Sequence, residues 1–406
     1  MGMKFGFLSG LLALVGLGLI SCGTNNTTTA ASASGILYVV TQGNSSVSAF
    51  GIDLANGTVT TNGNATATGN MPAAMILTAS AAFVANRQDN TISSYTFNSD
   101  GTLTVGSTTN LTNASTPMGM AIDSAGKFLF VANQGSNNVS VFSISSASLT
   151  EVAGSPFPTN DPRSPSVATG PASVAVTPGV NFLYVANQFS NTVGVFSIGA
   201  SGALTQIFGT GSSAPPYPAG LSPASASLAA TPTGNFLYLY VANQGSNNIS
   251  AFAVCAQTSL TCTAADGSLN PVQGSPFAAG LGPVAMAGAF AATSASTTTS
   301  ASLGSFLYVV DRNSNQVSEF KISTGTGALS INTQAAISTG SNPSAIVIGT
   351  GPGTLLADGG TTNYVYVANQ TDGTVSSYSY DTTTGVLNLV GNAVTTQGQP
   401  SALAVK

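Results

Sequence analysis

The feature that most constrains the fold of this 406-residue chain is a unit that occurs seven times. Its clearest copy runs from Phe128 to Ile144, where one β-rich run ends in Val-Ala-Asn and a second starts at Val139 after a polar turn. The positions equivalent to Asn133 are Thr41, Asn86, Asn133, Asn187, Asn243, Asp311 and Asn369. Successive copies lie 45 to 68 residues apart, at or above the length of a four-stranded propeller blade.

A second motif, a proline followed by a short apolar strand, also occurs seven times, at Pro72, Pro117, Pro171, Pro223, Pro283, Pro343 and Pro400. The two series are out of phase. The first unit, at Thr41, has no such strand before it, and the strand after Pro400 has no unit after it. Both facts are explained if Ser401–Val405 supplies the missing innermost strand of the first blade. Such closure removes the open edges of the sheet array.

Each repeat reads as four strands separated by turn residues. In the fourth repeat we expect strands at Ser173–Val176, Phe182–Ala186, Thr192–Ile198 and near Leu204–Ile207. Their almost continuous apolar and β-branched character is typical of sheets covered on both faces. The sequence therefore predicts an all-β protein, a single seven-bladed β-propeller over residues 36–406, closed by the C-terminal strand joining the first blade.

The N-terminus has the pattern of an export signal. Residues 1–21 contain Lys4 and then an apolar run, Phe5–Ile20, which is short for a membrane span. The run ends in Leu-Ile-Ser before Cys22, which resembles the lipobox of bacterial lipoproteins. We expect lipidation at Cys22, a flexible tether over residues 22–35 and a lipid-anchored protein in the cell envelope, on the periplasmic or outer-membrane side. An ordinary secretory signal with a chance cysteine is the alternative.

The two remaining cysteines, Cys255 and Cys262, are seven residues apart in one loop. An exported protein favours a disulfide between them, with free thiols as the alternative. A zinc site is disfavoured because the chain has no histidine and no further cysteine to complete the ligand set. We expect no metal and no cofactor.

Charged residues are only 5% of the chain, and the net charge is −5. No basic stripe exists to neutralise phosphates, so nucleic-acid binding is disfavoured. A surface of Ser, Thr, Asn, Gln and Gly suits a polar or anionic small molecule, a glycan or a protein as ligand. We expect a monomer whose contact with the membrane is the lipid anchor.

The recurring YVANQxSNxVSVFSI with a downstream G-x-L-T resembles the YVTN repeat and the seven-bladed propellers of the lactonase family, which includes 6-phosphogluconolactonase-like proteins. The resemblance covers residues 36–406. It implies a propeller fold and an enzyme that opens lactone rings with polar side chains, a histidine among them, near the mouth of the central channel. This chain contains no histidine, so no histidine-based site carries over to it.

All three arginines map to one face of the predicted ring, where the loops after the second and fourth strands open. Arg87 and Arg312 replace a recurring Gln directly after the aligned position, and Arg163 lies between the third and fourth blades. We expect Arg87, Arg163 and Arg312 to anchor an anionic or polyhydroxyl ligand. Asp311 or Asp89 is the nearby carboxylate for general-base work. The alternative is solvated turn residues, with Asp311 paired to Arg312.

Other recurring residues favour structural roles. We interpret the aligned Asn as turn chemistry, and Phe157 and Phe277 as residues that pack between blades. Two functional hypotheses remain. The first is an extracytoplasmic binding module that uses the loops of the arginine-bearing face. The second is a hydrolase that opens a sugar-type lactone, so whether the protein is an enzyme stays open.

Overall fold

The computed structural model describes residues 34–160, 166–179, 181–208, 216–230, 237–256, 265–289, 305–332, 336–355 and 361–406. Cys22, Arg163 and Cys262 lie outside these ranges. Every regular element within them is a β-strand, and they contain no helix with the length and apolar character of a membrane span. The strands belong to one compact unit, Ala33–Lys406.

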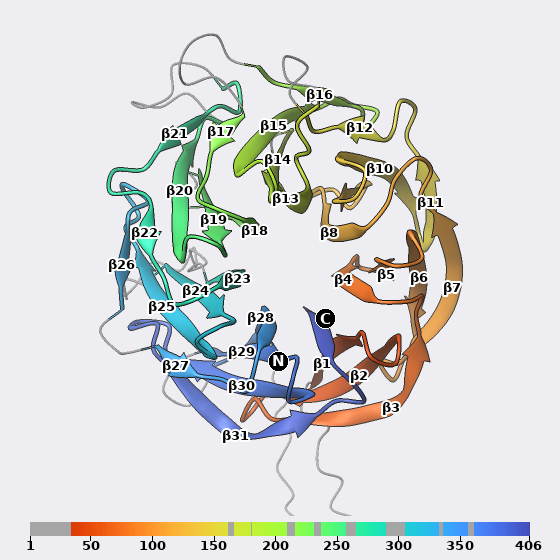
Figure 1. Cartoon of the computed structure of the whole chain (residues 1–406). Coiled ribbons are helices and arrows are strands. Elements are labelled where there is room, and N and C mark those ends of the chain that lie inside the picture. Colours follow the sequence, from red (N-terminus) through yellow and green to blue (C-terminus); the bar gives the residue numbers. More distant parts are fainter. Residues whose placement is uncertain are drawn as a thin grey trace, which may run out of the picture. The chain divides into compact units, whose positions relative to one another are not determined.

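Seven antiparallel sheets form a ring in this unit, so the predicted seven-bladed β-propeller is confirmed (Figure 1). The innermost strands of blades 1 to 7 are β32 (Pro400–Val405), β4 (Pro72–Leu77), β8 (Pro117–Ile122), β13 (Pro171–Val176), β18 (Pro223–Ala230), β23 (Pro283–Ala289) and β28 (Pro343–Leu355). The second strands are β1 (Ser34–Thr41), β5 (Ala81–Asn86), β9 (Phe128–Asn133), β14 (Phe182–Asn187), β19 (Leu237–Asn243), β24 (Phe306–Asp311) and β29 (Thr361–Asn369).

The outer half of each blade is less uniform. The third strands are β2 (Ser46–Asp53), β6 (Thr91–Phe97), β10 (Asn138–Ser145), β15 (Thr192–Ile198), β20 (Asn248–Val254), β25 (Gln316–Ile322) and β30 (Thr374–Tyr380). The fourth are β3 (Val59–Ala67), β7 (Leu103–Asn110), β11 (Ser148–Glu151), β16 (Leu204–Gln206), β21 (Leu269–Pro271), β26 (Leu329–Ile331) and β31 (Leu387–Thr395). Blades 3 to 6 add a short strand on the third one: β12 (Phe157–Pro158), β17 (Tyr217–Pro218), β22 (Phe277–Ala278) and β27 (Ile337–Ser338).

The C-terminal strand closes the ring as predicted. β32 pairs antiparallel with β1, and Tyr38 lies opposite Ala404 (Figure 1). Each innermost strand contacts the innermost strand of the next blade, from β32 through β4 and on to β28 and back to β32. The four predicted strands of blade 4 are also found, with ends that differ by one or two residues.

The second strands form the buried centre of each blade. All six side chains of β5, β9 and β24 are buried, which explains why these strands are continuously apolar and do not alternate. Apolar side chains of neighbouring blades pack together in seven clusters, and Phe157 and Phe277 pack against two of them, as expected.

The aligned Asn is a buried residue whose side chain joins parts of one blade by hydrogen bonds, and we call it the clasp residue. Asn86 is fully buried, and its Nδ2 donates to Thr91 Oγ1 and Ser93 Oγ on β6, both at 2.9 Å, while its Oδ1 accepts the Gly69 N–H at 3.0 Å. The interpretation as turn chemistry was therefore incomplete. The residue that takes the left-handed turn conformation lies four positions later, for example Asn90 with φ of 55°.

Tyrosines on the second strands connect neighbouring blades. Tyr240 in blade 5 donates its hydroxyl to the Gly327 carbonyl in the turn between β25 and β26 of blade 6, at 2.8 Å. The same contact recurs from Tyr38 to Gly101, Tyr184 to Gly267, Tyr308 to Gly385 and Tyr366 to Gly57. Burial of the ring raises the pKa of Tyr38 to about 12. These blade-to-blade contacts hold the ring as one body.

Candidate functional site

The top face, defined here by the connections between second and third strands and between successive blades, carries a ring of polar side chains. These side chains directly follow the second strands. Their backbone N–H groups bond to the residue just before each innermost strand, for example Arg87 N to Met71 O at 3.1 Å and Arg312 N to Gly282 O at 2.9 Å. We call this set the mouth ring; it comprises Gln42, Arg87, Gln134, Gln188, Gln244, Arg312 and Gln370.

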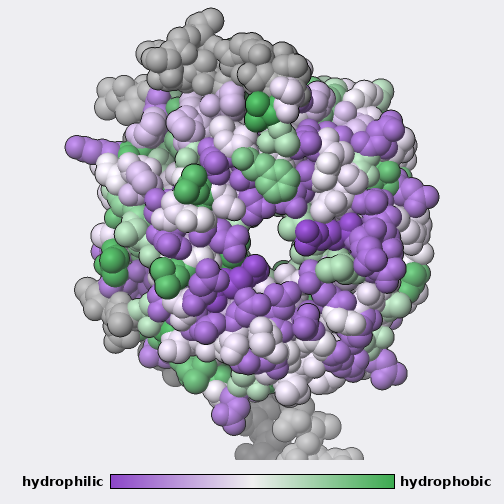
Figure 2. Space-filling model, viewed as in Figure 1, coloured by the Kyte–Doolittle hydropathy of each residue, from purple (hydrophilic) through white to green (hydrophobic). Residues whose placement is uncertain are grey.

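Contacts between amides of adjacent blades show how close these side chains lie. Gln134 Nε2 donates to Gln188 Oε1 at 2.6 Å, and Gln370 Nε2 donates to Gln42 Oε1 at 3.2 Å. Both contacts join equivalent positions of adjacent blades, so these side chains lie where the blades approach one another closely. Figure 2 shows an open channel at the centre of the molecule, bordered mainly by hydrophilic residues.

Arg87 in blade 2 is the least constrained member of the mouth ring. Its side chain is half-buried, and it forms no hydrogen bond or ion pair with any residue in the described ranges. A guanidinium with five donors in a fixed fork is thus held beside the channel with none of them used. It is available to a ligand.

Arg312 in blade 6 is only partly engaged. Its Nε donates to the Pro343 carbonyl of blade 7 at 3.4 Å, which fixes the side chain toward the next innermost strand. Burial lowers the pKa of its guanidinium from the ordinary value, although the group stays charged. The two terminal nitrogens have no partner among the residues of the described structure. Blades 2 and 6 are separated by two blades on one side of the ring and three on the other.

Asp311 occupies the clasp position of blade 6 and is not exposed at the mouth. Its side chain is 0% exposed, and its Oδ2 accepts from Ser318 Oγ at 2.5 Å and from Gln316 Nε2 at 3.5 Å. Oδ1 has no hydrogen-bond partner. Burial raises the pKa of the carboxyl to about 6, against the lowering effect of the hydrogen bonds from Ser318 and Gln316. No ion pair joins Asp311 to Arg312 in the described structure. This position does not suit a base that contacts a ligand.

Asp89, the other carboxylate expected near the arginines, fastens a loop. It accepts the Asn70 backbone N–H at 2.7 Å and the Asn70 Nδ2 at 2.9 Å. Asp372 has the same role in blade 7, where it accepts the Ser341 N–H at 2.7 Å. Both carboxylates are exposed but committed to the loops that enter the blades.

The remaining predicted site residues are placed only in part. Arg163 lies outside the described residues, so the structure places Arg87 and Arg312 on the same face and leaves the third arginine unassigned. Cys255 is buried and disulfide-bonded, and Cys262 also lies outside the described residues. Among the described residues no cluster of His, Cys, Asp or Glu is suited to a metal ion.

A family model for the seven-bladed β-propeller lactonases matches residues 31–162, 153–270 and 259–405. The chain belongs to this lactonase family. The match spans all seven blades of the propeller. No match was found among curated proteins.

Solved structures give the same fold for this lactonase-family chain. A putative 6-phosphogluconolactonase from Bacteroides fragilis superposes with a TM-score of 0.69 at 18% identity, covering 92% of this chain and 98% of that one. The periplasmic gluconolactonase PpgL of Pseudomonas aeruginosa superposes with a TM-score of 0.66 at 22% identity, covering 92% and 99%. At this identity the likeness shows the fold alone.

Sequence reasoning missed the mouth ring as a unit of this lactonase-family chain. The signal was present, because Gln recurs at one fixed offset after the second strand in five of the seven copies. Their amide-to-amide contacts make them part of the same surface.

Proposed function

We propose that the mouth ring binds a small, anionic, polyhydroxylated ligand of the sugar-acid class. The observation that carries this proposal is the pair of guanidinium groups at Arg87 and Arg312, neither of which meets a carboxylate in the described part of the chain. A guanidinium fork matches a carboxylate with two parallel hydrogen bonds. The neighbouring Gln amides offer both donors and acceptors, which suits hydroxyl groups.

Charge supports the same ligand class. The chain has a net charge of −5, yet the mouth presents two unpaired positive groups. A concave site lined by one sign of charge concentrates ligands of the opposite sign. A neutral or cationic ligand would leave both guanidinium groups without a partner.

A second function, opening of a sugar lactone, is favoured by membership of the lactonase family. The two functions share a ligand class, because hydrolysis of a sugar lactone yields a sugar acid. In that reaction, Arg87 and Arg312 would stabilise the oxyanion that forms as water adds to the lactone carbonyl. The mouth as described offers no uncommitted carboxylate for the base, and the chain has no histidine, so we place binding first.

The test combines binding and turnover. The full chain is purified in mild detergent, and the affinity for D-gluconate is measured by calorimetry beside acid release from D-glucono-δ-lactone. Replacing Arg87 and Arg312 together by Ala is expected to weaken gluconate binding roughly 100-fold, since each charged hydrogen-bonded contact contributes a factor of about ten or more.

Lys321→Ala is the matched control, because it removes an exposed positive charge on β25, outside the mouth ring. Gluconate binding without lactone turnover supports the binding module. Turnover above the uncatalysed rate, lost in the double arginine variant, supports the lactonase. No binding of either compound would overturn both proposals.

We also propose that the protein is exported and anchored through a lipid on Cys22, with the propeller outside the cytoplasm. The support is the apolar run that ends in Leu-Ile-Ser before Cys22. Mass spectrometry of the mature N-terminus from a bacterial host should find an acylated Cys22. Cys22→Ser should remove the protein from the membrane fraction. An unmodified N-terminus at another residue would contradict the proposal.

A further inference from the structure

Two exposed leucines distinguish blades 5 and 6 from the other blades on the top face. The position two residues before the proline that starts each innermost strand is occupied, in blades 1 to 7, by Gly398, Asn70, Ser115, Thr169, Leu221, Leu281 and Ser341. Five of these residues are small or polar. Leu221 is 57% exposed and Leu281 is 54% exposed, so both side chains contribute to the surface and not to a core.

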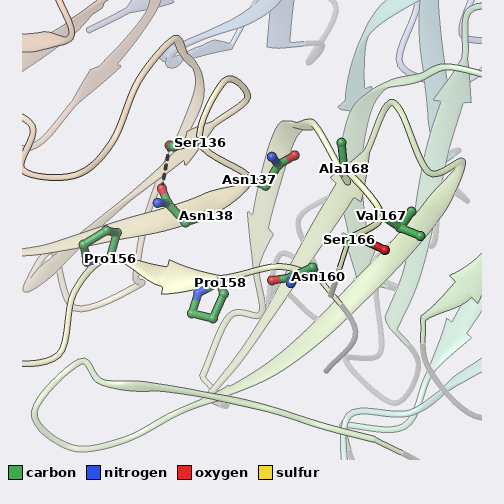
Figure 3. A pocket seen from close by; sticks show the side chains of 9 residues that line it. All are labelled: Ser136, Asn137, Asn138, Pro156, Pro158, Asn160, Ser166, Val167 and Ala168. Atoms are coloured by element: carbon green, nitrogen blue, oxygen red, sulfur yellow. Dashed lines mark hydrogen bonds between the residues drawn. The ribbon is translucent and has the colours of Figure 1, made fainter. Parts of the chain in front are cut away.

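The backbone at this position is held in the same way with or without a leucine. The N–H of Leu221 donates to Ser246 Oγ at 3.0 Å, as the N–H of Ser115 does to Ser136 Oγ in blade 3. Ser136 in turn donates to Asn138 Oδ1 at 3.0 Å, which fixes the hydroxyl (Figure 3). The loop therefore keeps its shape without an apolar side chain, and the leucines are free to serve another purpose.

One turn lies between the two leucines. In the turn after β19, the N–H of Gly245 donates to the Leu221 carbonyl at 2.9 Å. Two residues later, Asn247 Oδ1 accepts the N–H of Gly282 at 2.8 Å, directly after Leu281. Leu221 and Leu281 are thus fixed on the two sides of this turn, and Gly245 places no side chain between them.

The same arc of the top face carries part of the mouth ring. Gln244 is the first residue of the turn between the leucines. On the other side of Leu281, its carbonyl accepts the N–H of Asn313 at 2.9 Å, next to Arg312. The order along the arc is therefore Leu221, Gln244, Leu281 and Arg312. Hydrophobic residues set among hydrophilic ones around the channel are seen in Figure 2.

We propose, on the basis of the function proposed for the mouth ring, that Leu221 and Leu281 bind an apolar substituent of its acidic ligand. The ligand class is then narrower than a free sugar acid. It is a uronic acid in glycosidic linkage to an apolar group. Its carboxylate reaches the guanidinium of Arg312, and its apolar group covers the leucines beside that arginine.

The combination of charge and apolar surface selects this class of ligand. Small-molecule sites join apolar surface to a few fixed polar groups, and exposed apolar side chains bordered by polar ones are typical of such sites. A wholly polar ligand would leave the leucines in water. A wholly apolar ligand would take water from Arg312 without replacing its hydrogen bonds.

The experiment compares methyl β-D-glucuronide with phenyl β-D-glucuronide by calorimetry, on the full chain in mild detergent. The two compounds share the acidic sugar, so the difference between their affinities reports the apolar contact. We expect the phenyl glycoside to bind about tenfold more tightly, because part of its ring leaves water on contact with the leucines.

Leu221→Ser together with Leu281→Ser should remove this preference and leave the affinity for the methyl glycoside unchanged. Serine is the natural residue at the equivalent positions of blades 3 and 7, so the double variant is compatible with the fold. Ile331→Ser is the matched control, because it removes an exposed apolar side chain from the outer strand β26. It should keep the preference for the phenyl glycoside.

Gluconate binding, measured on the same samples, separates this proposal from the proposed function. Equal affinities for the two glycosides, or a phenyl preference that persists in the double leucine variant, would overturn the apolar contact alone. Binding of gluconate but of neither glycoside would do the same. Loss of all three compounds would overturn the proposed function, and the apolar contact with it.

Discussion

Asp311 shows how much one atom matters at a repeated position. In five blades the clasp residue is Asn, whose Nδ2 donates to the third strand, as Asn243 does to Asn248 and Ser250. A carboxylate cannot donate, and blade 6 compensates by turning the hydrogen bonds around. Gln316 and Ser318 donate to Asp311 instead. One carboxylate oxygen still has no partner, which is costly in a buried place.

Asp311→Asn is expected to stabilise the protein, and more so at high pH. The pKa of the carboxyl is about 6 in the folded protein against an ordinary value of 3.8. Because the pKa is higher in the folded protein, ionisation of Asp311 lowers the free energy of unfolding. The stability is fully present below pH 3.8, where the carboxyl is protonated in both states, and is lost as the pH rises through 6. Removing the charge should therefore add roughly 1–3 kcal/mol at pH 8 and much less at pH 4.

Denaturant unfolding at the two pH values measures this difference. Ser344→Ala, a polar change on the inner strand of blade 7, serves as a variant whose effect should not depend on pH. An equal gain at both pH values, or a loss at pH 8, would contradict the assignment of a raised pKa to Asp311.

The arginines illustrate what the sequence predicts at the scale of residues. The fixed offset after the aligned position placed Arg87 and Arg312 correctly on the top face. It did not distinguish the half-buried Arg312 from the fully buried Asp311 one residue earlier. Successive side chains alternate in direction at the end of the second strand, so only one of Asp311 and Arg312 points into the blade. Which one does so also depends on hydrogen-bond donors from the third strand. Local sequence does not contain that information.

At the scale of elements, the turn between the third and fourth strands is a contact between blades. Its glycine has a positive φ, 71° at Gly327, and it lies against the ring of Tyr238 in the preceding blade. A Cβ there would overlap that ring, and the conformation itself disfavours other residues. The repeated G-x-L pattern is therefore a consequence of blade packing as well as of turn geometry.

Gly327→Ala should destabilise the propeller by about 2–4 kcal/mol, from backbone strain and overlap with Tyr238. Gly325→Ala, two residues away in the same turn, is the control, because an added Cβ there meets nothing within 4 Å. Thermal and denaturant unfolding of both variants gives the comparison. Equal effects of the two changes would show that the packing against Tyr238 is unimportant.

The outer strands show how a protein with few charged residues keeps its exposed edge strands from pairing with other chains. Charged side chains commonly block an exposed edge strand, but this chain has few of them. β3 and β31 instead contain a register shift beside a positive-φ glycine, Gly63 or Gly391. Blades 3 to 6 interrupt the fourth strand altogether. Both devices remove a long, straight edge from the rim.

At the scale of the whole molecule, fold and site differ in how far the sequence predicts them. The spacing and phase of two repeated motifs predicted the number of blades and the closing strand. They could do so because every blade buries its inner strands in the same way and therefore repeats the same sequence pattern. The candidate site depends on positions where the blades differ, such as Arg87 and Arg312, where the other five copies have Gln.

Removing the closing strand should prevent the ring from forming. Without Pro400–Lys406, β1 loses its inner partner, and β28 and β4 lose their neighbour. We expect no cooperative thermal transition and association through the exposed edge, measured by circular dichroism and size-exclusion chromatography. Lys406→Ala should behave like the parent protein. A monomeric, cooperatively unfolding deletion variant would contradict this expectation.

The pairing of β1 with β32 joins residues at opposite ends of the chain, such as Tyr38 and Ala404. The first blade thus stays incomplete until β32 has been synthesised and has paired with β1. Contacts of such long sequence separation form slowly, so we expect ring closure to be a late step in folding. A polypeptide that stops a few residues early has no closed state to reach, and it remains a substrate for proteases. Ring closure therefore also separates chains that contain the C-terminal strand from chains that lack it.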